Sequence, residues 1–193
     1  MKNKFGFILV NPQLGENIGA CARSLKNFGF SNLHIVSPKQ PWPNRKAKDT
    51  SVGAYDVIKR AKIYDNTYDA ISDFNIVISL SARKRDINKK HISINQFLKI
   101  IKSKKNTKFG FMFGPEASGL SNDDLSLSNF VLQIPTSKKF KSLNLSHSLT
   151  VISYEIFKLI NFKKFEKNTK DIKISSKREI STLVLHLKRL LEK

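Results

Sequence analysis

Three short segments of the chain hold residue types that could do chemistry. The first, residues 11–23 (NPQLGENIGACAR), contains Asn17 and Gly19, which suit a tight turn, and ends at Arg23. A helix beginning here would offer free backbone N–H groups to an anion such as phosphate, and Arg23 would add a positive charge. The segment therefore predicts a phosphate-binding turn. The alternative is that Arg23 is an ordinary surface residue of an amphipathic helix.

The second segment, residues 113–120 (FGPEASGL), is a glycine-containing loop that holds one acid, Glu116. The spacing of Gly114 and Gly119 fits a Walker phosphate loop. However, Leu120 stands where that loop needs its lysine, and Glu116 would repel phosphates. A nucleoside triphosphatase is therefore excluded, and no G-x-G-x-x-G occurs to indicate a dinucleotide fold. Glu116 suits contact with a cation or an arginine, unless it is simply a solvated loop acid.

The third segment, residues 141–148 (KSLNLSHS), places Ser142 and Asn144 where a loop runs into a helix. Both residue types cap helices, so capping alone could explain them. Ser146 and His147 do not indicate a catalytic triad, because adjacent helical side chains point in different directions. The chain's histidines have no ligand-like spacing, so we expect no metal site.

Basic residues are in large excess and cluster near these segments. The chain has 35 Lys and Arg against 15 Asp and Glu, which gives a net charge of +20 and favours a polyanionic partner. Two aromatic residues, Trp42 and Phe140, accompany the clusters, as expected of a surface that binds structured RNA. A solvated lysine face, or a lysine-rich composition inherited from the genome, could explain any single cluster. The clusters are Arg45, Lys46 and Lys48; Arg83, Lys84 and Arg85; and Lys138, Lys139 and Lys141.

The elements that must position these residues alternate between strands and helices, which predicts an α/β fold with a mainly parallel sheet covered on both faces. Ligands of such sheets gather beyond the carboxyl ends of the strands. Residues 38–50, with three prolines, are expected to form an exposed loop. The apolar runs predict strands at 5–10, 33–36, 75–80, 108–113 and 130–134. Helical spacing predicts helices at 17–28, 52–61, 68–74, 93–105, 121–127 and 145–162.

The organisation we expect is a main domain over residues 1–162, a basic linker over 163–177 and a short C-terminal helix over 178–193. Ser176 and Glu179 form a potential capping box for that helix. Its apolar stripe could pack on the main domain or contact a partner. The single Cys21, the lack of a spanning apolar run and the lack of a signal peptide favour a cytoplasmic protein without a membrane anchor.

Taken in order and spacing, the three segments resemble the SpoU/TrmH family of RNA 2′-O-methyltransferases, within the SPOUT class. The first resembles the motif N-x-G-x-x-x-R, the second F-G-x-E-x-x-G-L and the third S-L-N-[LV]-S. Residues 81–83 (SAR) and 177–190 (KREISTLVLHLKRL) resemble the TrmJ subgroup. That subgroup methylates a pyrimidine ribose at the start of the tRNA anticodon loop. Alternatives are methylation of the wobble ribose or of rRNA, and a non-catalytic RNA-binding protein that retains the fold.

The resemblance implies a Rossmann-like sheet whose C-terminal part is a deep trefoil knot, although knots are nearly absent from proteins in general. It also implies a homodimer with composite active sites, in which the helix at 145–162 forms the interface. The cofactor would be S-adenosylmethionine. By position, the cofactor would be lined by Leu80, Ser81, Ala82, Gly114, Ile134, Ser142, Leu143 and Asn144.

The resemblance further implies residue roles for methyl transfer to a ribose. Arg23 would bind the adjacent phosphate and stabilise the developing alkoxide, since an arginine pKa above about 12 makes it a poor general base. Glu116 would orient Arg23, and Ser142 or Asn144 would hydrogen-bond the ribose. These four are the expected catalytic residues. The expected RNA-binding residues are Asn17, Arg23, Arg83, Arg85, Lys138, Lys139 and Lys141.

Overall fold

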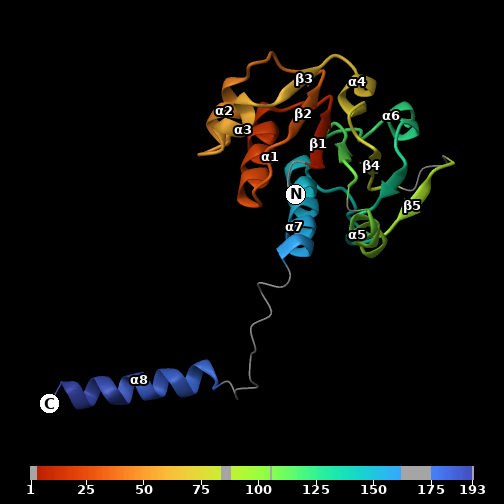
Figure 1. Cartoon of the computed structure of the whole chain (residues 1–193). Helices are drawn as coiled ribbons and strands as arrows, with labels where there is room; N and C mark the ends of the chain where they lie inside the picture. The colour runs from red at the N-terminus through yellow and green to blue at the C-terminus, as the bar shows by residue number, and fades with distance from the viewer. Residues whose placement is uncertain (1–3, 84–87, 105, 162–174, 193) are drawn as a thin grey trace. The chain divides into compact units, whose positions relative to one another are not determined.

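The computed structural model describes residues 4–83, 88–104, 106–161 and 175–192. The chain divides into two compact units, Met1–Ile160 and Asn161–Lys193 (Figure 1). The predicted linker at 163–177 lies outside the described residues, apart from its last three.

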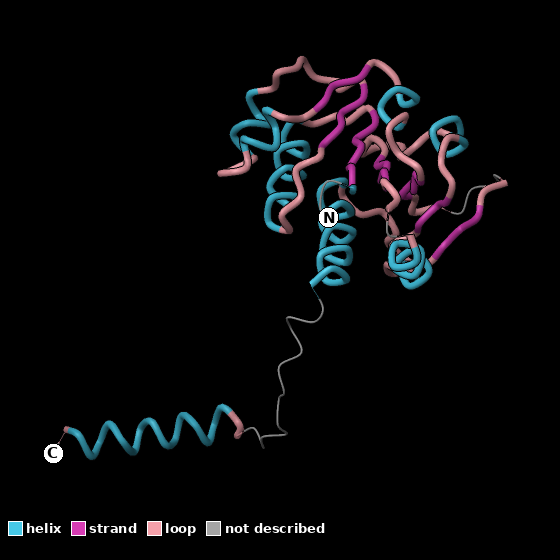
Figure 2. Tube along the Cα trace, in the orientation of Figure 1, coloured by secondary structure: helices cyan, strands magenta, loops and turns pink. Residues whose placement is uncertain are grey.

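The first unit is built on a seven-stranded sheet in the order β3-β2-β1-β6-β4-β7-β5. Its strands are the magenta segments of Figure 2. Every pairing is parallel, which confirms the predicted α/β class and parallel sheet. The two edge strands, β3 and β5, were not expected, because three residues of mixed polarity leave no apolar run to recognise. The strands are β1 Phe5–Val10, β2 Leu33–Val36, β3 Lys62–Tyr64, β4 Ile76–Leu80, β5 Lys90–Ile92, β6 Phe109–Phe113 and β7 Phe130–Leu132.

The helices follow the predicted positions with two corrections. First, α1 begins two residues earlier than expected, so Asn17 and Gly19 lie within the helix rather than in a turn. Second, the stretch predicted as an exposed loop contains α2, where the Asn44 side chain caps the helix and Ala47 is fully buried. The helices of this unit are α1 Gly15–Asn27, α2 Arg45–Thr50, α3 Tyr55–Lys59, α4 Thr67–Ile71, α5 Ile94–Ser103, α6 Asn122–Ser126 and α7 Leu145–Asn161.

Both faces of the sheet are covered, as predicted. Alternate residues of β1 point to opposite sides, so Phe7 joins one apolar cluster and Ile8 joins the other. The first cluster takes its helical residues from α1, α2, α3, α5 and α7, and the second from α4 and α6. Gly19 lets α1 approach α2 closely, because a Cβ there would collide with Thr50 and with the backbone of Ala47. The first cluster therefore packs α1 and α7 against the same face of the sheet.

The second unit contains α8, Lys177–Leu191. It begins with the predicted capping box, in which the Ser176 hydroxyl accepts from the Glu179 N–H and the Glu179 carboxylate accepts from the Ser176 N–H. No residue of α8 is buried, and its apolar side chains are exposed. Across the described ranges, no helix is long and apolar enough to cross a membrane.

Candidate active site

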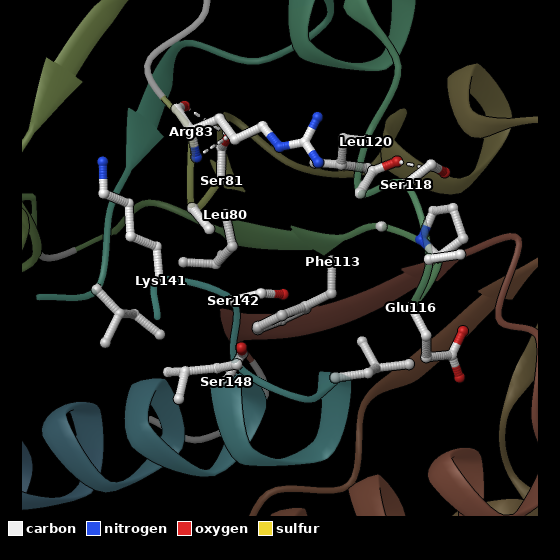
Figure 3. A pocket seen from close by; sticks show the side chains of 18 of the residues that line it. Leu80, Ser81, Arg83, Phe113, Glu116, Ser118, Leu120, Lys141, Ser142 and Ser148 are labelled. Carbon is white, nitrogen blue, oxygen red and sulfur yellow. Dashed lines mark hydrogen bonds between the residues drawn. The ribbon is translucent and has the colours of Figure 1, made fainter. Parts of the chain in front are cut away.

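A pocket of about 280 Å³ lies where β4, β6 and β7 end. Three loops form its walls, contributed by residues 80–83, 113–120 and 132–148 (Figure 3). This is the edge of a parallel sheet at which ligands are expected. The second and third loops are the segments that the sequence singled out, and the first follows β4.

Most of the predicted cofactor residues line this pocket. Those that do so are Leu80, Ser81, Ala82, Gly114, Ile134, Ser142 and Leu143, whereas Asn144 does not. The Ser81 hydroxyl donates to the Arg83 carbonyl at 2.9 Å, so this side chain closes its own turn. The Gln133 amide, which the sequence analysis missed, donates to the Ala82 carbonyl at 3.1 Å. These two contacts fix the first wall of the pocket and occupy the carbonyl groups of Ala82 and Arg83.

The second loop is tight because of its two glycines. A Cβ on Gly114 would collide with the backbone of Gly119 and Leu120, which fold back against it. Gly119 has a φ of +70°, which is unfavourable for other residues, and its N–H donates to the Pro115 carbonyl at 2.8 Å. The spacing of the two glycines is therefore what brings this loop around one side of the pocket.

Glu116 contacts the start of α1 rather than Arg23. Its carboxylate accepts hydrogen bonds from the N–H of Gln13 at 2.8 Å, from the N–H of Leu14 at 3.3 Å and from the Asn17 side-chain amide at 2.7 Å. The predicted phosphate site at this helix N-terminus is therefore wrong, because a carboxylate of the protein already accepts from its N–H groups. Glu116 forms no ion pair with Arg23 within the described residues, so it can orient Arg23 only through α1, the helix that carries it.

Asn17 and Asn144 complete a hydrogen-bonded connection between the three segments. The Asn144 amide donates to the Asn17 side-chain oxygen at 3.1 Å, and Asn17 in turn donates to Glu116. The Asn144 oxygen accepts from both the N–H and the hydroxyl of Ser146 at 2.8 Å, at the start of α7. The Gln13 side chain accepts from the Ala117 N–H at 3.0 Å. The polar side chains of these segments therefore hold the loops together, and neither Asn17 nor Asn144 lines the pocket.

Arg23 stands apart from the pocket of its own chain. It is exposed on α1, does not line the pocket and forms no ion pair with any residue that the structure describes. Among the predicted RNA-binding residues, Arg83 and Lys141 line the pocket. Lys138 and Lys139 are exposed on the loop that leads to Lys141. Arg85 lies outside the described residues. A single chain therefore does not bring all the expected catalytic groups together.

The charged groups of the pocket lie at its ends. Figure 3 shows Lys141 at one end and Glu116 at the other, with Arg83 extending along the upper side.

The thiol of Cys21 on α1 and the acidic residues are further groups that could do chemistry. Burial, and then the Glu116 charge, raise the pKa of the Cys21 thiol, so this cysteine is not a nucleophile at neutral pH. Within the described ranges, no three His, Cys, Asp or Glu residues are grouped so as to hold a metal ion.

Comparisons with known proteins identify relatives of this chain. The model of the SpoU rRNA Methylase family matches residues 4–154. The chain is 40% identical over 154 residues to the tRNA (cytidine-2′-O-)-methyltransferase TrmJ of Methanocaldococcus jannaschii, covering 78% of this chain and 66% of that protein. It is 32% identical over 157 residues to the tRNA (cytidine/uridine-2′-O-)-methyltransferase TrmJ of Sodalis glossinidius, covering 81% of this chain and 61% of that protein.

A solved structure agrees with these relatives. The crystal structure of TrmJ from Z. mobilis ZM4 superposes with a TM-score of 0.76 at 32% identity, covering 97% of this chain and 79% of that one. The chain spans less than two thirds of the length of the two curated relatives above.

Proposed function

The chain belongs to the SpoU rRNA methylase family, and we propose that it is an S-adenosylmethionine-dependent tRNA ribose 2′-O-methyltransferase. Its substrate is the ribose of a pyrimidine nucleotide in tRNA, as the names of its cytidine- and uridine-methylating relatives suggest. We place that nucleotide at the start of the anticodon loop, because the TrmJ subgroup that the sequence motifs resemble acts there. The observation that carries the proposal is the convergence of the three motif segments. Two of them wall one pocket at the carboxyl edge of the sheet, and side-chain hydrogen bonds tie the first to both.

The pocket fits S-adenosylmethionine in its chemistry. The side chains of Leu80, Ile134 and Leu143 offer apolar contact to an adenine ring, and the three loops offer backbone hydrogen-bonding groups. Arg83 provides positive charge for the carboxylate of the methionine moiety. When bound, the cofactor supplies an electrophilic methyl group for transfer to an oxygen.

The protein residues must then activate a weakly acidic ribose hydroxyl and hold it in place. We assign Arg23 to the phosphate beside that ribose and to the alkoxide that develops during transfer. Ser142 lines the pocket and is assigned to hydrogen-bonding the ribose. Asn144 and Glu116 act as positioning residues, because their side chains contact α1 and α7 rather than the pocket interior.

The exposed position of Arg23 supports a homodimer in which Arg23 of one copy serves the pocket of the other. The apolar helix α7 is the proposed interface, and its Tyr154 is 48% exposed. With family membership, we also propose the deep trefoil knot in the C-terminal part of the sheet, tRNA as the partner and the cytoplasm as the location. The homodimer, the knot, the tRNA partner and the cytoplasmic location are proposals that draw on the family and the relatives.

Mixing two inactive variants tests the composite site. Arg23→Ala keeps an intact pocket. Gly114→Val keeps Arg23 but disrupts the pocket wall, because its Cβ would collide with the backbone of Gly119 and Leu120. If Arg23 acts across the dimer, one site of each mixed dimer has both an intact pocket and an arginine, and activity returns on mixing and re-equilibration. If Arg23 acts within its own chain, no mixed dimer has a complete site, and the mixture stays inactive.

Transfer of a labelled methyl group tests the function itself. The protein is incubated with labelled S-adenosylmethionine and unmodified tRNA or rRNA transcripts, and the labelled nucleotide is mapped. We expect the label on a pyrimidine 2′-oxygen at the start of the anticodon loop. Label at the wobble ribose or in rRNA would contradict the proposed substrate, and label on a base would contradict the proposed reaction. Binding of RNA without methyl transfer would favour a non-catalytic protein.

A further inference from the structure

The loop at residues 136–141 (TSKKFK) projects an aromatic ring and three cations away from the core. The Thr136 hydroxyl donates to the Lys141 carbonyl at 3.1 Å, and the Phe140 N–H donates to the Ser137 carbonyl at 3.2 Å. These hydrogen bonds close the loop on itself, so the side chains at its tip face outward. Phe140 is 78% exposed, a large fraction for a phenylalanine.

The cations of this loop have no acidic partners in the described part of the chain. Lys138, Lys139 and Lys141 are exposed and belong to none of its ion pairs. The Phe140 ring likewise forms no ring–ring or cation–ring contact with the residues described. Each of these side chains therefore offers an interaction that the protein itself does not use.

A shallow groove of about 450 Å³ lies beside this loop, beyond the ends of β7 and β5. Its charged residues are Lys138 and Lys141, and no carboxylate lines it. Lys141 also lines the candidate active site, so the groove and the pocket share a wall. Figure 3 shows Lys141 at the end of the pocket opposite Glu116. The groove thus continues the active site along the same edge of the sheet. The groove residues are His91, Ile92, Ser93, Gln133, Pro135, Thr136, Lys138 and Lys141.

We propose that the loop at 136–141 and this groove bind the single-stranded RNA that adjoins the methylated nucleotide. Phe140 stacks on an unstacked base, and Lys138 and Lys141 contact the flanking phosphates. Unstacked bases of RNA loops bind aromatic side chains in this way, and cations beside the ring neutralise the backbone. The inference rests on the proposed function, and it names where the substrate strand runs beyond the methylated ribose.

Steady-state kinetics with Phe140 variants test the inference. Stacking on one base contributes enough affinity that Phe140→Ala should raise KM for the tRNA transcript about tenfold. The Kd for S-adenosylmethionine, measured by calorimetry, should not change, and Phe140→Tyr should keep most of the tRNA affinity. Tyr68→Ala is the matched control, because Tyr68 is an aromatic residue on α4 that is 70% exposed. It should leave both constants unchanged.

A wild-type KM for tRNA in Phe140→Ala would overturn the proposal, as would an equal loss in Tyr68→Ala. A changed Kd for S-adenosylmethionine would also overturn it, by assigning the loop to the cofactor. If the wild-type protein transfers no methyl group at all, the proposed function fails, but filter binding of an anticodon-loop oligonucleotide still compares the same variants. A 4-thiouridine placed next to the target nucleotide should crosslink to the peptide containing residues 136–141, and crosslinking elsewhere would overturn the inference.

Discussion

The basic residues on the β3 side of the sheet differ from those on the β5 side in what they contact. On the β3 side, Lys46 pairs with Glu16 at 2.8 Å and Lys26 pairs with Asp56 at 2.6 Å. Hydrogen bonds from these lysines hold the pKa values of both carboxyls below their usual range. The charges of these two lysines are therefore balanced within the protein.

On the β5 side, the cations near the pocket are unbalanced. Arg83, Lys138, Lys139 and Lys141 belong to none of the ion pairs found in the described ranges. A polyanion binding on the β3 side must compete with resident carboxylates, whereas on the β5 side it need not. Clusters that look alike in sequence therefore differ in their capacity to bind RNA, and the partner of each cation, rather than its number, decides the difference.

The largest expected effect concerns Arg23, the exposed exception on the carboxylate-rich side. Arg23→Ala should lower kcat for methyl transfer by about 100- to 1000-fold, because it removes the cation assigned to the developing alkoxide. The Kd for S-adenosylmethionine should stay unchanged, because Arg23 does not line the pocket of its own chain. Single-turnover kinetics and calorimetry measure the two quantities. Near-normal turnover in Arg23→Ala would contradict the role assigned to Arg23 in the reaction.

The next effect is a pH dependence of stability that originates on the β3 side. His34 of β2 is 2% exposed, and burial, followed by the charge of Lys62, lowers its pKa to about 4. The unfolded chain binds this proton below about pH 6.5, whereas the folded chain does not until about pH 4. Stability should therefore fall as the pH drops through this window, by about 2 kcal/mol between pH 7.5 and pH 5.

Urea unfolding at pH 7.5 and pH 5 measures this effect. In His34→Gln the loss of stability between the two pH values should shrink by about 2 kcal/mol, because the titrating group is gone. His147→Gln, a change at an exposed histidine of α7, should behave as the wild type does. An unchanged pH dependence in His34→Gln would assign the acid sensitivity to other groups.

A direct test of the two sides compares paired with unpaired cations. The double variant Lys138→Ala and Lys139→Ala should weaken tRNA binding about tenfold and reduce the dependence of affinity on salt concentration. The double variant Arg45→Ala and Lys46→Ala removes the same charge from the β3 side, where both residues have carboxylate partners. It should change tRNA affinity less than about twofold. Equal losses would mean that net charge alone governs binding.

The smallest effect concerns Glu116, which joins the two sides. Glu116→Ala leaves two N–H groups at the start of α1 without their acceptor and should lower the free energy of unfolding by about 1 kcal/mol. It should also lower kcat without changing the Kd for S-adenosylmethionine, because α1 carries Arg23. Glu116→Gln keeps one oxygen as an acceptor and should restore part of both. Loss of cofactor binding in Glu116→Ala would instead give Glu116 a direct role in the pocket.

Local sequence patterns predicted most of the fold. The continuous apolar run at Phe5–Val10 predicted a strand buried on both faces, and all six of its residues are buried in the structure. The capping boxes at Ser121 and Ser176 mark helix starts through contacts that span only three residues. The short strands β3 and β5 escaped prediction because they depend on pairing with β2 and β7 rather than on their own pattern.

The sequence by itself determined the class of sheet, the three motif segments and the types of side chain available at its edge. Only the tertiary structure decided what those side chains contact. Glu116 binds the N–H of Gln13 across 103 residues of chain, and Asn144 binds Asn17 across 127. It also decided which cations form ion pairs with carboxylates on the β3 side and which remain unpaired on the β5 side. Contacts of this range depend on how strands are ordered in the sheet, and spacing along the chain does not record that order.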